Sequence, residues 1–258
     1  MWRLVKTELY SLIKSDTYRR LSIACFVLGA ACLGRDRGSA LAMTGYEWFC
    51  NRQLAGGWAM IPLPVFVADY VAAEHTNHAF VLELLCGYTR KEIIGAKGIV
   101  CMAGIVGLGL MNTIAGVLVT TLFNGFGAAF HETTVAHMAT ILIYYILGAI
   151  VNVGAIPFLV AVMTESKIGT ITLGLCAVQF VGVATAQIPY ILVRMKESCW
   201  KNIIDNTVQL LPIYQVDSIL NPQKYKPHPY WLFFVSCSVC LIIVNRLSVY
   251  FFGKSDLR

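Results

Sequence analysis

Apolar residues gather in six runs with polar segments between them, at about residues 21–34, 54–71, 98–123, 135–163, 168–193 and 230–251. A helix needs roughly 20 mostly apolar residues to cross a bilayer. Five of the runs approach or exceed that length, and the first must borrow flanking residues. The pattern predicts an all-α membrane protein with six transmembrane helices, in which residues 1–258 form one transmembrane domain.

Two amphipathic segments flank or interrupt these runs. In residues 1–17, five apolar residues share one helical stripe, which predicts an interfacial helix lying on the membrane surface. A signal-peptide n-region is the alternative for this segment. In residues 194–229, apolar residues recur between proline breaks, which predicts an outer loop with short re-entrant helices. The five stripe residues are Trp2, Val5, Leu9, Leu12 and Ile13.

The runs themselves contain a few informative residues. Pro62 and Pro64 predict a kink in the second run, and Asn124 with Gly125 predicts the turn that ends the third. Four glycines of the third run predict close helix packing; they are Gly104, Gly107, Gly109 and Gly116. Four amide side chains need a partner or water inside a membrane and are candidate pathway or packing residues. They are Asn112, Asn152, Gln179 and Gln187.

Composition agrees with a membrane protein. The chain is 57% hydrophobic and only 13% charged, whereas soluble domains carry roughly 25% charged residues. With the N-terminus inside, 12 of the 20 Lys and Arg residues face the cytoplasm, which favours a multi-pass cell-membrane protein with both termini cytoplasmic. Most of the nine Cys lie inside apolar runs as small packing residues. A disulfide between Cys50 and Cys199 is left open.

Motifs for catalysis, metals and nucleotides are missing from the sequence. Gly253-Lys254-Ser255 imitates the end of a P-loop, but Ser248 stands where the motif needs glycine. His131-Glu132 lacks the second histidine at zinc-protease spacing, and His75 with His78 is more typical of solvated histidines than of metal ligands. We therefore expect no catalytic residue, no metal, no cofactor and no nucleic-acid partner. Any ATP must be bound and hydrolysed by another polypeptide.

The polar stretch between the second and third runs, residues 69–97, has the most distinctive pattern. Phe80, Val81, Leu84 and Leu85 recur on one face of a short helix, and Gly87 suits a left-handed cap after it. Three basic residues follow where the chain re-enters the membrane, as the cytoplasmic side requires; they are Arg90, Lys91 and Lys97. A short apolar helix at the membrane surface predicts contact with lipid or with a soluble protein.

This stretch, Leu84-Leu-Cys-Gly-Tyr-Thr-Arg-Lys-Glu-Ile-Ile-Gly-Ala-Lys97, resembles the first cytoplasmic loop of type-2 ABC transporter permeases. The segments Val5-Lys-Thr-Glu-Leu9 and Phe252-Gly-Lys-Ser-Asp-Leu257 are similar to the family's N-terminal helix and its usual ending. The resemblance implies that residues 74–97 form a cytoplasmic coupling loop whose helix docks on a separate ABC ATPase subunit. It also implies a second permease subunit, identical or not. The implied ATPase contacts are His78, Phe80, Val81, Leu84, Leu85 and Arg90.

The resemblance implies a permease subunit of an exporter, not itself an enzyme, that moves an amphipathic substrate. The family's bacitracin, lantibiotic and antimicrobial-peptide branch suggests an antimicrobial peptide or drug. Few charges lie in the runs, which suits a substrate taken from the bilayer better than a free ion. The alternatives are a membrane-embedded processing enzyme and a secondary transporter. An enzyme would need a recognisable set of intramembrane polar residues, and a secondary transporter would show matched broken helices in its two halves.

Overall fold

The computed structural model describes residues 1–31, 44–51, 61–76, 79–128, 131–194, 204, 206–207, 209–211, 215 and 230–254, with only the backbone for residues 51, 75–76, 132, 181–194 and 230. Within these residues every regular element is a helix, as the sequence predicts. In chain order they are α1 (Trp2–Lys14), α2 (Asp16–Ala31), α3 (Gly45–Asn51), α4 (Pro62–Val67), a π-helical segment (Ala68–Ala72), α5 (Ala73–Thr76), α6 (Ala79–Leu85), α7 (Arg90–Asn124), α8 (Glu132–Gly148), a second π-helical segment (Ala149–Ala155), α9 (Ile156–Thr164), α10 (Lys167–Arg194) and α13 (Tyr230–Lys254).

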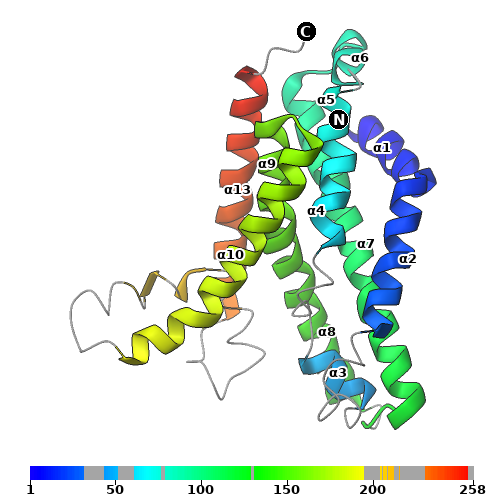
Figure 1. Cartoon of the computed structure of the whole chain (residues 1–258), viewed down its shortest axis with the longest axis vertical. Coiled ribbons are helices and arrows are strands. Elements are labelled where there is room, and N and C mark those ends of the chain that lie inside the picture. The colour runs from blue at the N-terminus through cyan, green and yellow to red at the C-terminus, as the bar shows by residue number, and fades with distance from the viewer. Residues whose placement is uncertain are drawn as a thin grey trace.

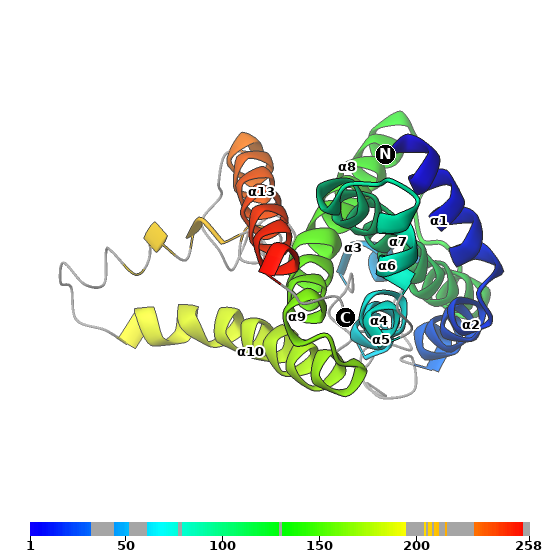
Figure 2. The same cartoon turned by 90° about the horizontal axis from the view of Figure 1, so that it is seen from above.

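Helix α7 is the centre of the bundle and contacts α1, α2, α3, α4 and α13 (Figure 1). Seen from above, α10 lies at the edge of the bundle and its far end points away from the other helices (Figure 2). Helices α1 and α6 lie at one end of the molecule together with the last turn of α13, while α3 lies at the opposite end. The beginning and the end of the described chain therefore share one end of the bundle.

Three helical stretches are long and apolar enough to cross a membrane, judged by length and composition within the described residues. They are Arg90–Asn124, Thr133–Thr164 and Trp231–Lys254. Two shorter apolar stretches, Pro62–Ala72 and Lys167–Phe180, belong to the second and fifth predicted runs. The chain is thus an all-α protein compatible with a membrane, and six spans remain a prediction.

The glycines of α7 make room for aromatic side chains more than for neighbouring backbones. A Cβ added at each would collide with or press on one ring: Phe66 at Gly104, Tyr18 at Gly107, Tyr145 at Gly109 and Trp48 at Gly116. The hydroxyls of Tyr18 and Tyr145 also donate hydrogen bonds to the carbonyl oxygens of Gly104 and Gly109, both at 3.2 Å. Close packing at these glycines is confirmed, and the partners are side chains of α2, α3, α4 and α8.

The kink predicted at Pro62 and Pro64 stays a prediction, because residues 54–60 of this run lie outside the described residues. The two prolines occupy the first turn of α4. In that turn a proline lacks only an N–H that has no intrahelical acceptor anyway. The irregularity falls one turn later, in the π-helical segment Ala68–Ala72. The fourth run has a similar π-helical segment, followed by Pro157 in the first turn of α9.

The predicted end of the third run is confirmed, since α7 ends at Asn124 and Gly125 has a φ of 76°. A helix, α1, forms where the sequence predicts one, its position at a membrane surface stays a prediction, and its apolar stripe is divided. Val5 and Leu12 are buried against the bundle, whereas Trp2, Leu9 and Ile13 are exposed. Most of the predicted short helices in residues 194–229 lie outside the described residues.

Candidate functional site

The predicted coupling stretch forms a helical corner that we call the α6 corner. It comprises α5, α6, the first two turns of α7, the facing side of α1 and the last turn of α13, all at one end of the bundle (Figure 1). Local sequence explains its shape. Gly87, with a φ of 88°, ends α6 in the left-handed conformation that the sequence predicts. Thr89 and Glu92 then form a capping box that starts α7.

A buried lysine is the centre of this corner. The side chain of Lys97 on α7 is fully buried, and its Nζ lies 2.9 Å from Glu8 Oε1, 2.5 Å from Glu74 Oε2 and 2.9 Å from Glu83 Oε1. The Tyr70 hydroxyl donates a hydrogen bond to the second oxygen of Glu8 at 2.8 Å. Through these three ion pairs Lys97 connects α7 to α1, α5 and α6 at once.

The charges of this cluster do not balance, because three carboxylates surround one ammonium. Burial raises the pKa of Glu74 to about 7, although Lys97 opposes the shift. Burial also raises the pKa of Glu83, again against the attraction of Lys97, and the neighbouring Glu8 adds to the increase. For Glu8, burial acts in the same direction, but Lys97 outweighs it and the pKa is lowered. Near neutral pH the cluster therefore retains a proton on Glu74 in part of the molecules.

An aromatic contact closes the corner against the end of the last helix. The Phe80 ring on α6 is fully buried and its centroid lies 4.9 Å from that of Phe252 on α13. Arg90 Nη1 donates hydrogen bonds to the carbonyl oxygens of Phe252 at 2.7 Å and Gly253 at 3.1 Å. Carbonyls in the last turn of a helix carry partial negative charge, so a cation is favourable there. Arg90 thus ties the start of α7 to the end of α13.

The four apolar residues predicted as one contact face are divided between inside and outside. Phe80 is buried, Leu84 is partly buried against the core, Val81 is half-buried, and Leu85 is 78% exposed. Leu82, which the prediction left out, is 63% exposed. Of the other predicted contacts, Arg90 is engaged with α13 and His78 lies outside the described residues. The apolar surface that α6 presents outward is therefore Leu82 and Leu85, which we call the α6 outer face.

The candidate pathway amides do not gather at one place. Asn112 Nδ2 donates to the Cys25 carbonyl oxygen at 3.0 Å, so it ties α7 to α2 as a packing residue. Asn152 is half-buried in the second π-helical segment, and Gln179 is exposed on α10. Gln187 lies where only the backbone is described. Within the described part of the chain, no group of three or more His, Cys, Asp or Glu side chains is arranged to hold a metal ion.

The sequence pattern indicates a surface helix here but misses the Lys97 cluster. Glu8, Glu74, Glu83 and Lys97 come from four segments, and the first and last are 89 residues apart. A partial signal is present, since Glu83 lies off the apolar face of α6 and so needs a polar partner. Nothing in its spacing names Lys97 as that partner.

A scan of the chain against protein-family models finds no match, and a search of curated proteins finds none either. The features that bear on function are therefore the sequence motifs and the α6 corner. The α6 corner joins the helices before and after α6 to both terminal helices through buried contacts. Such an arrangement is suited to transmit a displacement of α6.

Proposed function

We propose that the chain is the permease subunit of a type-2 ABC exporter, with six transmembrane spans and both termini in the cytoplasm. The observation that carries the proposal is the α6 corner, a short helix with an apolar outer face whose inner side is locked to four other helices. The motif Gly87-Tyr-Thr-Arg90 with Lys97, which resembles the family's coupling loop, lies at this corner. A separate ABC ATPase would dock on α6 and hydrolyse the ATP.

The contacts support a mechanism in which α6 moves with the bundle. Docking of the ATPase would cover Leu82 and Leu85, and burying each such side chain contributes roughly 1.5–3 kcal/mol. Because Glu83 is paired with Lys97 and Phe80 packs on Phe252, a push on α6 would displace α7 and α13 together. The π-helical segment Ala68–Ala72, directly before α5, is the irregular point at which the second helix could flex.

Two such subunits would face each other and form the export path between them. The substrate class follows only from the resemblance and from the small number of charges in the apolar helices. It is an amphipathic molecule, such as an antimicrobial peptide or drug, taken from the bilayer.

The proposal is tested by co-purification of the chain with its ATPase and by ATP-dependent export. Leu85→Asp places a charge on the α6 outer face, which a dry interface resists. We expect this variant to insert and fold, to lose the ATPase on purification and to lose export. Leu85→Met is the matched control, because it preserves an apolar side chain of similar volume. A Leu85→Asp variant that retains a bound, active ATPase would contradict the docking site.

A further inference from the structure

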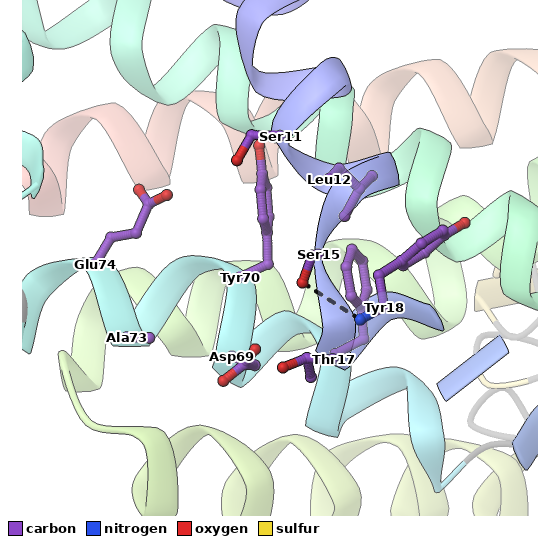
Figure 3. Close-up of a pocket in the computed structure, with 10 residues that line it drawn as sticks. Ser11, Leu12, Ser15, Thr17, Tyr18, Asp69, Tyr70, Ala73 and Glu74 are labelled. Atoms are coloured by element: carbon purple, nitrogen blue, oxygen red, sulfur yellow. Dashed lines mark hydrogen bonds between the residues drawn. The ribbon is translucent and has the colours of Figure 1, made fainter. Parts of the chain in front are cut away.

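A cavity of about 140 Å³ lies beside the α6 corner, between α1 and α2 on one side and the helix from Phe66 to Glu74 on the other. Ser11 and Ser15 reach it from α1 and the α1–α2 junction, and Thr17 from the first turn of α2 (Figure 3). Asp69 and Glu74 contribute carboxylates from the opposite wall. The volume corresponds to several water molecules or to a small polar head group.

Aromatic rings form part of the wall. Tyr18, Phe66 and Tyr70 all line the cavity, with ring centroids 5.5 Å apart for the first pair and 5.7 Å for the second. The face of an aromatic ring attracts cations. Rings combined with carboxylates and hydroxyls are the surroundings that an organic ammonium group prefers, whereas a phosphate or carboxylate would be repelled.

The charges around the cavity favour the same ligand. None of the ten lining residues is Lys or Arg. Asp69 pairs with Lys167 at 2.9 Å, and Glu74 shares Lys97 with Glu8 and Glu83. Four carboxylates face two ammonium groups, which leaves two excess negative charges when all six groups are ionised. The proton that Glu74 retains in part of the molecules near neutral pH offsets at most one of these charges. A cation in the cavity would offset one of them.

The cavity also lies at the level of a predicted membrane surface. Helix α1, which borders it, exposes Trp2 and Ile13 on its outer side, as an interfacial helix does. The cavity is therefore near the depth of lipid head groups. A primary ammonium has three N–H donors, and carboxylates and hydroxyls of the wall can accept them.

We infer that this cavity binds a primary ammonium group, either the ethanolamine head group of a phospholipid or a free alkylamine. The inference does not depend on the proposed transport function, because it rests on the cavity walls, their charge and the predicted interfacial position of α1. Defined lipids test this binding.

The test is native mass spectrometry of the purified full chain from bilayer discs with equal amounts of phosphatidylethanolamine and phosphatidylglycerol. We expect phosphatidylethanolamine to be retained at least about fivefold over phosphatidylglycerol. Asp69→Asn removes a cavity carboxylate and should reduce the preference to near unity. Lys167→Gln breaks the same Asp69–Lys167 pair but preserves the carboxylate, so it should retain or increase the preference.

Two further measurements identify the source of the ligand and control for misfolding. Displacement of the lipid by excess free ethanolamine would show that the amine alone suffices, whereas retained lipid would show that the whole head group is recognised. If the Asp69→Asn variant is not monodisperse, Thr17→Val takes its place. This substitution removes one hydroxyl at nearly constant volume and should lower the preference for phosphatidylethanolamine severalfold. Equal retention of the two lipids by the unmodified chain, or a preference insensitive to the cavity variant used, would overturn the inference.

Discussion

The two ends of the bundle are held together by different chemistry. At the α6 corner, buried charged groups and an aromatic pair connect five helices around Lys97 and Phe80. At the opposite end, α3 is held by the buried Trp48 ring, which packs on Gly116. Neutral hydrogen bonds near the surface complete the attachment: Gly45 N to Gly125 O at 3.1 Å, Tyr46 N to Phe126 O at 2.9 Å, and the Tyr46 hydroxyl to His137 Nδ1 at 2.8 Å. A charged group left unpaired in a buried site costs far more than a lost exposed hydrogen bond. The α6 corner should therefore be the stiffer end, as the proposed transmission of force from α6 requires.

The largest effect is expected from Lys97→Met. This change leaves three carboxylates without their shared cation, and removal of one partner from a buried ionic cluster destabilises by roughly 3–5 kcal/mol. Unfolding in mixed detergent micelles measures the change. Lys167→Met is the control, because the Lys167–Asp69 pair is partly exposed and exposed pairs contribute about 0–1 kcal/mol. Similar losses for both variants would refute the central role of Lys97.

A slightly smaller loss is expected from Phe80→Ala. Truncating a buried phenylalanine removes its contacts and leaves a cavity, at a cost of about 3 kcal/mol. Leu85→Ala on the same helix should change the free energy of unfolding by less than about 0.5 kcal/mol, since Leu85 is exposed. The same unfolding assay compares the two. Equal effects would mean that α6 is not packed with Phe80 inward.

The buried carboxylates of the α6 corner should also make the free energy of unfolding of the chain depend on pH. The folded-state pKa of Glu74 is raised from 4.5 to about 7, because burial disfavours its charged form. Between these values the folded state binds more protons than the unfolded state, so this contribution to stability is present below about pH 4.5 and is lost as the pH rises through 7. Glu83 acts in the same direction. The pKa of Glu8 is lowered, so its contribution to stability has the opposite pH dependence and changes only in more acidic solution.

Glu74→Gln should remove most of that loss, because an amide has no proton to release. We therefore expect the variant to be more stable than the unmodified chain at pH 8 and to show a flatter profile between pH 5 and pH 8. Unfolding midpoints measured across this range test the expectation. If Glu74→Gln leaves the pH dependence of the unfolding midpoint unchanged, another group is responsible for the titration.

The smallest effect is expected at the opposite end. Tyr46→Phe removes the hydroxyl that bonds His137, an exposed pair, and should cost at most about 1 kcal/mol. A comparable substitution at the α6 corner, Tyr70→Phe, leaves Glu8 with one hydrogen bond fewer in a more buried place. It should cost more than Tyr46→Phe in the same assay, and the reverse order would contradict the comparison of the two ends.

The sequence predicts local features of the corner well and its contacts poorly. Gly87 and Asn124–Gly125 are correctly identified because a cap or turn depends on residues adjacent in the chain. The inward side of α6 could not be identified, since Phe80 and Leu84 on one side and Leu82 and Leu85 on the other are all apolar. Only the tertiary position of Phe252 decides which side is buried. The Lys97 cluster likewise depends on four segments that meet only in the folded protein.

The proposed function depends above all on docking of an ATPase to the α6 outer face. A photo-crosslinking amino acid placed at Leu85 tests it most directly, with the same label at Leu122 as the control. Leu122 is 82% exposed and lies near the opposite end of α7. We predict an ATP-sensitive protein crosslink at position 85 whose partner peptides include a P-loop, and no such product at position 122. Lipid adducts alone at position 85, or the same protein products at both positions, would contradict the claim.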